Sequence, residues 1–221
     1  MRAKSFLEVY DRLYQHYGPQ KNWWPGETEF EILVGAVLVQ NTNWTNVAKA
    51  MDNLRDAGLL SFAAMHATPA DELAELIRPS GYYNVKAKRL HNLLKMISGC
   101  YGGDLDALLA GSTEDARSNL LTVKGVGPET ADVILLYCGN HPVFVVDNYT
   151  HRVFSRHGLV AEECDYNELQ EEFTSRLEPD PQLYGEYHAL IVMVGKDYCK
   201  KSSPLCEMCP LAGIEEGGAG V

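Results

Sequence analysis

Apolar residues recur along this chain at three- and four-residue spacing, and that helical period excludes most other architectures. The only strand-like run, at 143–146, is too short and isolated to build a sheet. We therefore predict an all-α protein of about ten helices. Helical runs are expected at about 3–17, 28–39, 44–57, short segments from 61 and from 68, 83–99, 104–110, 113–122, 128–139, 149–157, 165–177 and 183–195.

Local signals suggest where some of these helices begin and end. Thr42 or Asn43 can cap the helix at 44–57, and Thr68 can cap the next, with Pro69 in its first turn. Gly99 closes the run that begins at residue 83.

Length and charge leave several functions open. The 221 residues suffice for one large domain or two small ones. No apolar run is long enough for a membrane helix, and the N-terminus lacks the apolar core of an export signal, so we expect a soluble cytoplasmic protein. The net charge is −11, but residues 162–186 alone contribute −8. A local basic face can coexist with that acidic segment, so the net charge does not exclude nucleic acid.

A glycine turn separates two helical runs at Leu121-Thr122-Val123-Lys124-Gly125-Val126-Gly127-Pro128. Its glycines allow positive φ and the close approach of another backbone. Amides of such a turn, followed by a helix N-terminus, form an anion site that suits a DNA phosphate. The alternative is a plain connection between helices.

An aspartate opens the helix that follows the buried run at 143–146. Asp147 can simply be an N-cap. Its position twenty residues beyond the second glycine of the turn favours a catalytic carboxylate instead.

Aromatic and basic residues mark two further segments. Trp23 and Trp24 are adjacent at a helix break, so both cannot point into one core, and one of them is expected to line a cleft and stack on a flat ligand. The alternative is two core tryptophans on either side of a bend. Lys86, Lys88 and Arg89 begin the helix at 83–99, where they face either DNA or solvent.

Three cysteines, Cys199, Cys206 and Cys209, are spaced as thiolate ligands of an iron–sulfur cluster or of zinc. Cys100, Cys138 and Cys164 are scattered, and the sequence assigns them no role.

Taken together, these motifs resemble the helix-hairpin-helix DNA glycosylases of the endonuclease III superfamily, from about Glu27 to Cys209. The resemblance implies two helical domains with the active site in the cleft between them. One is a helical barrel over 27–140 that contains the hairpin at about 115–139. The other combines the N-terminal segment 1–26 with 141–198, a cysteine loop at 199–215 and a disordered tail at 216–221.

The same resemblance implies roles for individual residues. Gly125-Val126-Gly127, with Lys124, would grip a DNA phosphate, and Asp147 would be catalytic. Gln40 would lie near the gap left by a flipped-out nucleotide, and the cysteine loop would hold a [4Fe-4S] cluster.

The 3-methyladenine glycosylase branch of the superfamily is the more similar one. It is similar in Trp23-Trp24-Pro25, in Gln40-Asn41-Thr42 and in the run from Arg78 to Leu90. Trp44 matches an aromatic of that branch's base pocket, and Lys196 matches a pocket lysine.

Two positions depart from the wider family. Glu129 stands where bifunctional members carry the lysine that forms a Schiff base, and a carboxylate cannot form an imine. Glu215 stands where the fourth cysteine of the cluster is expected.

We therefore expect a monomeric, monofunctional DNA glycosylase of base-excision repair that removes alkylated purines from double-stranded DNA and associates with the nucleoid. One alternative is a bifunctional endonuclease III that acts on oxidised pyrimidines. The other is a non-catalytic DNA-binding module, which would need the hairpin but neither Asp147 nor an aromatic pocket.

Overall fold

The computed structural model describes residues 2–21 and 23–214, with side chains from residue 5 onward, and these parts of the chain are helical without strands. The expected all-α class is confirmed, with twelve α-helices and two short 3₁₀ helices in the described ranges. Residues 143–146 run buried and extended but pair with no other strand among those residues.

The chain divides into two compact helical units, which we call the terminal unit (Met1–Trp23 and Pro142–Val221) and the central unit (Trp24–His141). The terminal unit contains α1 (Arg2–Tyr17), α10 (Asn148–Arg156), α11 (Tyr166–Thr174), α12 (Pro181–Asp197) and the 3₁₀ helix η2 (Cys206–Met208). The central unit contains α2 (Glu29–Leu38), α3 (Trp44–Asp56), α4 (Phe62–Ala67), α5 (Ala70–Leu76), η1 (Arg78–Ser80), α6 (Tyr83–Tyr101), α7 (Leu105–Leu109), α8 (Thr113–Leu121) and α9 (Pro128–Tyr137).

Two of the expected helix ends differ from the structure. Thr68 does not begin α5: it ends α4, where its hydroxyl donates to the Ala64 carbonyl at 2.8 Å. The N-cap of α5 is Pro69. Gly99 does not end α6, because the helix continues to Tyr101 and stops at Gly102, whose φ of 62° is left-handed. An interior glycine costs a helix only about 1 kcal/mol, and packing of the surrounding turns outweighs it. Asn43 is confirmed as the cap of α3.

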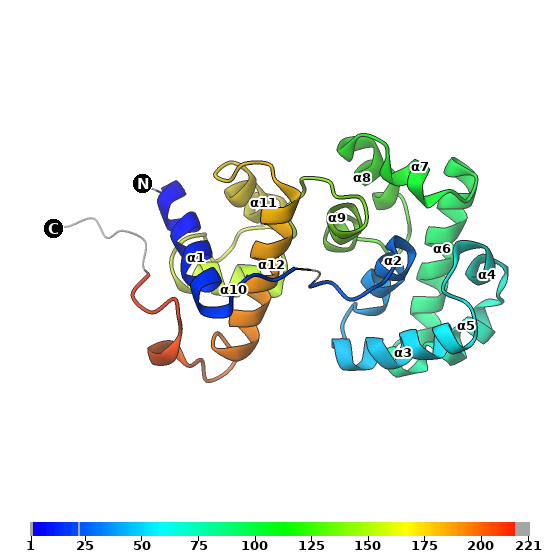
Figure 1. Cartoon of the computed structure of the whole chain (residues 1–221), viewed down its shortest axis with the longest axis horizontal. Coiled ribbons are helices and arrows are strands. Elements are labelled where there is room, and N and C mark those ends of the chain that lie inside the picture. The colour runs from blue at the N-terminus through cyan, green and yellow to red at the C-terminus, as the bar shows by residue number, and fades with distance from the viewer. Residues whose placement is uncertain (1, 22, 215–221) are drawn as a thin grey trace. The chain divides into compact units, whose positions relative to one another are not determined.

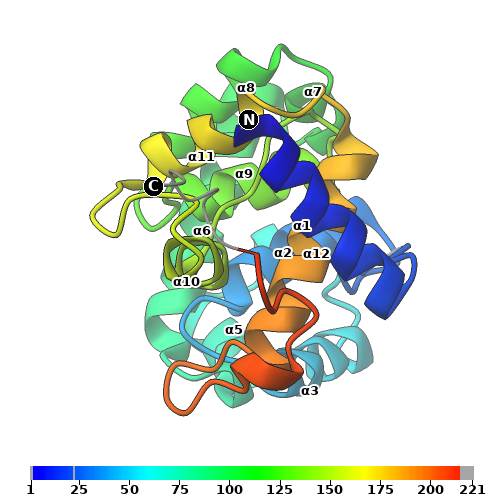
Figure 2. The same cartoon turned by 90° about the vertical axis from the view of Figure 1, so that its left-hand side faces the viewer.

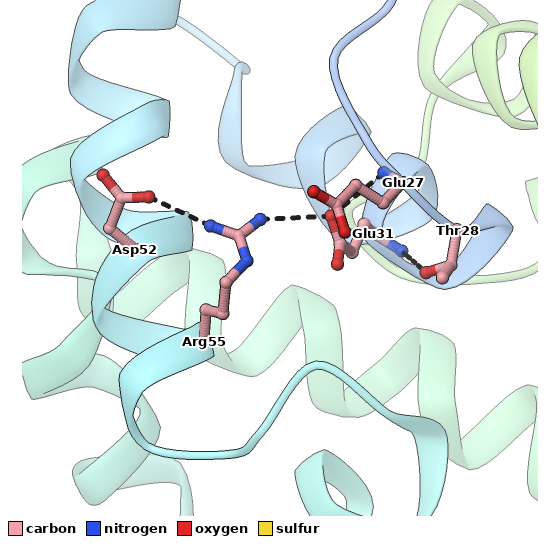
Figure 3. A network of polar contacts seen from close by, with 5 residues as sticks. All are labelled: Glu27, Thr28, Glu31, Asp52 and Arg55. Atoms are coloured by element: carbon pink, nitrogen blue, oxygen red, sulfur yellow. Dashed lines mark hydrogen bonds and ion pairs between the residues drawn. The ribbon is translucent and has the colours of Figure 1, made fainter.

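Helix α2 is the buried axis of the central unit, with α3, α6 and α9 packed around it (Figure 1). Its N-terminus is fixed by Glu31, which is 6% exposed. The Glu31 carboxylate accepts from the Glu27 N–H at 3.1 Å and from Arg55 of α3 at 3.2 Å, while Thr28 caps the helix (Figure 3). This network fixes the start of the helix that leads to Gln40.

A buried ion pair joins the two helices of the hairpin. The Asp132 carboxylate on α9 is fully buried, and Arg117 on α8 binds both of its oxygens, at 2.6 and 3.1 Å. The bidentate geometry fixes the rotation of α9 relative to α8.

Aromatic rings from α1, the segment 143–146, α10, α11 and α12 form the core of the terminal unit. Phe144 stacks on Phe173 at 4.1 Å, and Phe6 and Phe154 meet the same ring at 4.9 and 4.6 Å. The hydroxyl of Tyr187 donates to the Phe6 carbonyl, which ties α12 to α1, and the two helices lie side by side (Figures 1 and 2). This core thereby holds the start of α10 and the middle of α12 in fixed positions.

In the described part of the chain, each helix is too short or too polar to cross a bilayer.

Arg117→Ala should lower the free energy of unfolding by about 3–5 kcal/mol, because the buried Asp132 carboxylate loses its guanidinium partner. Urea denaturation measures the loss. The control is Arg78→Ala, which breaks an ion pair with Glu75 whose side chains are 57% and 63% exposed, and it should cost no more than about 1 kcal/mol. Equal losses in the two variants would contradict the structural role of the buried pair.

Candidate functional site

Asp147 caps helix α10 at the point where the buried segment 143–146 ends. Its Oδ1 accepts from the Thr150 N–H at 2.7 Å and from the Thr150 hydroxyl at 2.9 Å. The side chain is only 13% exposed, so its position is set by these two donors rather than by solvent. The N-cap interpretation is therefore correct, and it leaves Oδ2 available for another role.

His188, on α12, lies beside that second oxygen, and its Nε2 is 3.7 Å from Oδ2 of Asp147. Burial by itself raises the pKa of Asp147, but the imidazole and the two Thr150 donors together outweigh burial and lower this pKa below its ordinary 3.8. Asp147 is consequently a carboxylate anion at neutral pH in a largely water-free position. Such a group can stabilise a developing positive charge or accept a proton from water.

Trp23 extends this cluster within the terminal unit. Its ring meets the His188 ring edge-on, with centroids 5.5 Å apart and planes at 86°. Trp23 is half-buried, so part of the indole remains accessible to a ligand. The expected base-pocket residue and the expected catalytic residue therefore adjoin the same histidine.

Lys196 is exposed in the last turn of α12. The preceding residue, Gly195, packs against the Tyr149 ring of α10, where a Cβ would leave no room for Tyr149. Close packing of α12 on α10 therefore fixes the helix end that carries Lys196.

The glycine turn of the central unit forms the predicted hairpin between α8 and α9. Val126 is buried, and its N–H donates to the Val123 carbonyl at 3.0 Å, which anchors the turn from inside. Gly125 has φ +104°, a conformation that favours glycine, whereas Gly127 caps α9 with an ordinary φ of −99°. Lys124 is exposed at the tip of the turn.

Gln40 connects this turn to the rest of the central unit. Its amide nitrogen donates to the Gly125 carbonyl at 3.2 Å and to the Thr130 hydroxyl at 2.9 Å, and its amide oxygen accepts from the Arg89 guanidinium. The aliphatic part of Arg89 lies against Gly125, where a Cβ would clash with it. The amide of Gln40 is thus engaged with the hairpin, a role that the sequence analysis did not anticipate.

The structure corrects the prediction that Lys86 contacts DNA. Lys86 is 1% exposed, and its ammonium donates to the carbonyls of Leu38 and Ser80 at 2.8 and 2.6 Å. Burial, and secondarily the neighbouring Arg89, lower its pKa to about 8. Lys86 therefore joins the end of α2 to η1 and the start of α6, whereas Lys88 is exposed.

A cavity of about 370 Å³ lies next to Gln40. It is lined by Gln40, Asn41, Tyr82, Val85, Lys86 and Arg89. Tyr82 is 74% exposed and has φ +48°, and a left-handed, exposed aromatic residue is unusual outside functional sites. The sequence shows two adjacent tyrosines after Gly81 but does not indicate which of them points outward.

The tryptophans of the central unit have different surroundings. Trp24 is 7% exposed, stacks on Tyr137 at 5.0 Å and meets Trp44 edge-on at 5.1 Å. Its burial corrects the prediction that it stacks on a base, because it is a core residue. Trp44 is only half-buried and remains a candidate.

The three clustered cysteines share one loop of the terminal unit. Cys199 is buried and Cys206 is exposed. The pKa of Cys209 is raised, mainly by its burial and to a smaller extent by the nearby Cys199 and Cys206 thiols. Arg156 holds the loop, donating to the carbonyls of Lys200 and Lys201.

A complete metal site is not assembled by the residues that the structure describes. Within 2–21 and 23–214, no three His, Cys, Asp or Glu side chains converge as ligands of a metal ion. Glu215, the expected fourth position, and the tail at 216–221 lie outside the described residues.

Comparisons with known proteins agree with these features. Residues 34–179 match the family model of the HhH-GPD superfamily of base excision DNA repair proteins. A Methanocaldococcus jannaschii protein named "Putative DNA repair glycosylase" is 46% identical over 213 residues, which cover 95% of each chain. Endonuclease III of Thermotoga maritima is 32% identical over 81% of this chain and 79% of its own.

A solved structure with the same fold is the H. pylori 3-methyladenine DNA glycosylase bound to 1,N6-ethenoadenine. It is 33% identical, covers 87% of this chain and 97% of its own, and superimposes with a TM-score of 0.76. The family match spans more than half of the chain and includes both the hairpin and Asp147. This protein is a member of the HhH-GPD superfamily of base excision repair DNA glycosylases.

Proposed function

We propose that this protein is a monofunctional DNA glycosylase that removes alkylated purines from duplex DNA by hydrolysis. The observation that carries the proposal is the buried carboxylate of Asp147, which has a lowered pKa and is held by Thr150 through one oxygen only. Glu129, exposed in the first turn of α9, supplies no amine at the position where bifunctional members have one.

In the proposed step, the bond between the sugar C1′ and the base nitrogen breaks, and its electron pair leaves with the base. Positive charge develops on the sugar, and the Asp147 carboxylate stabilises it. A water molecule then forms the new bond to C1′ and gives its proton to Oδ2. An N-alkylated purine is already cationic, so it leaves without needing a strong general acid.

Aromatic rings would select the substrate. A cationic base gains cation–π energy against an indole face that an ordinary base does not. Trp23 and Trp44 keep partly accessible rings, and each is a candidate partner of a flipped-out base; Lys196, exposed on α12, is a further candidate contact. The similarity to the H. pylori 3-methyladenine DNA glycosylase supports this substrate class.

The central unit would grip the duplex. The N-terminus of α9 would bind a phosphate next to Gly127, because the positive end of a helix dipole favours an anion, with Lys124 and Lys88 adding charge. The cavity beside Tyr82 and Gln40 offers an exposed aromatic ring and the amide side chain of Asn41, which suit contacts to unstacked bases.

The cysteine loop would stabilise the terminal unit. Cys199, Cys206 and Cys209 are the proposed thiolate ligands of a [4Fe-4S] cluster, and the fourth cysteine of the family is absent because position 215 is a glutamate. No step of the proposed hydrolysis uses this cluster.

The second candidate function is a bifunctional endonuclease III, and the 32% identity to the Thermotoga maritima enzyme favours it. It requires a nucleophilic amine other than the lysine replaced by Glu129.

Asp147→Asn should reduce base release from an alkylated duplex by at least about 100-fold, because the amide carries no charge and accepts no proton. Asparagine is also a good N-cap, so folding and duplex affinity should persist. Single-turnover release and fluorescence anisotropy measure the two properties. The control is Asp165→Asn at the cap of α11, which is exposed and should leave release unchanged. Retained turnover in Asp147→Asn would remove this residue from the mechanism.

Gly127→Ala should lower duplex affinity about tenfold, a loss of roughly 1.4 kcal/mol, while stability stays unchanged. A Cβ at residue 127 meets nothing within 4 Å in the protein but would stand between the α9 amides and a phosphate. Gly125→Ala should lower stability as well, because its φ is positive and Arg89 fills the space. Anisotropy and thermal melting separate the two effects. Full affinity in Gly127→Ala would show that no phosphate approaches there.

Borohydride should trap no covalent complex between the unmodified protein and DNA, because Glu129 stands at the position of the Schiff-base lysine and a carboxylate cannot form an imine. Glu129→Lys should begin to trap, since a neutral amine can condense with C1′. The matched control is Glu114→Lys, an exposed first-turn glutamate of α8, which should not trap. Efficient trapping by the unmodified protein would establish the bifunctional candidate.

A further inference from the structure

The proposed chemistry gives no role to His188, although this histidine is buried next to the proposed catalytic group. It lies in the middle of α12 and is 3% exposed. Burying an imidazole among apolar residues is unfavourable unless its nitrogens have polar surroundings. One polar group that the imidazole faces is Oδ2 of Asp147, which lies 3.7 Å from Nε2 of His188.

The two oxygens of Asp147 have different surroundings. Oδ1 receives both donors of Thr150, from the helix that Asp147 itself begins. Oδ2 faces α12 and the imidazole. Thr150 therefore fixes the position of Oδ1. The rotation of the carboxylate, which places Oδ2, depends on the contact between Oδ2 and His188.

Trp23 controls the orientation of the imidazole. Its ring stands at 86° to the His188 ring with centroids 5.5 Å apart, so the imidazole packs edge-on against the indole. A ring held in this way has little freedom to turn its Nε2 away from Oδ2.

We propose that His188 is a positioning residue for Asp147, which aims Oδ2 at the reacting sugar and keeps the carboxylate ionised in its buried setting. This inference rests on the catalytic role proposed for Asp147. His188 itself touches neither the sugar nor the base in this account. The direction of the electrostatic effect agrees, because His188 and Thr150 lower the Asp147 pKa that burial would otherwise raise.

The test compares His188→Phe and His188→Gln with the unmodified full-length protein on an alkylated duplex. His188→Phe should release base about 10- to 100-fold more slowly, while duplex affinity stays within about twofold. The acid limb of its rate profile should move to higher pH, because burial then raises the Asp147 pKa with less opposition. His188→Gln keeps an N–H donor, so it should recover most of the rate at neutral pH while its acid limb stays displaced.

The matched control is His141→Phe. His141 is also a buried histidine, 9% exposed, but it contacts Thr113 and the Leu109 carbonyl within the central unit. That variant should lose stability without moving the acid limb.

An unmodified rate and acid limb in folded His188→Phe would overturn the proposal. If that variant does not fold, an unmodified acid limb in His188→Gln overturns it equally. Failure of the proposed function itself would look different, because the unmodified protein would then release no base or Asp147→Asn would keep its activity.

Discussion

The proposed chemistry of this protein depends on a carboxylate, that of Asp147, which is ionised although it is largely buried. Burial alone would raise the pKa of Asp147. His188 and Thr150 outweigh burial and lower this pKa below its ordinary value. The arrangement needs a helix that starts at residue 148, a buried extended segment before it, and α12 beside it. The aromatic core around Phe144, Phe154 and Tyr187 holds these parts in register. The side chain of Asp147 is thus both the N-cap of α10 and the buried anion.

In the central unit, a single side chain likewise serves several purposes at the hairpin. Gln40 receives Arg89 on its oxygen and donates to Gly125 and Thr130 through its nitrogen, so one amide joins α6, the turn and α9. The hairpin is therefore preformed before any ligand arrives, which lowers the entropy cost of binding a phosphate. It also means that Gln40 must exchange these bonds if it is to contact DNA directly.

Much of the fold follows from the sequence because helical periodicity and capping residues are local signals. The spans of α1, α2, α3 and α10 agree closely with the predicted ranges, and Asn43 caps α3 as its side chain suggests. Two helix ends differ from the prediction, because the Thr68 hydroxyl bonds back to Ala64 and ends α4, and because α6 stops at the left-handed Gly102 rather than at Gly99. The family could also be predicted from the sequence, because the hairpin turn and the cysteine spacing are characteristic patterns.

The site residues were harder to predict from the sequence, because whether a side chain is buried or exposed depends on the fold. Lys86 and Lys88 are two residues apart with the same chemistry, yet one ammonium is enclosed by carbonyls and the other is exposed. Trp23 and Trp24 differ in the same way, since Trp24 is enclosed by Tyr137 and Trp44. His188 gave no sequence signal, because 41 residues separate it from the carboxylate it faces.

The most direct test of this account is a base-release assay across a panel of duplexes, each with one alkylated, oxidised or mismatched base. Mass spectrometry identifies the released base, and hot alkali reveals the abasic site. The account predicts free alkylated purine and a strand that stays intact until alkali is added. Strand cleavage without alkali, or release confined to oxidised pyrimidines, would contradict it.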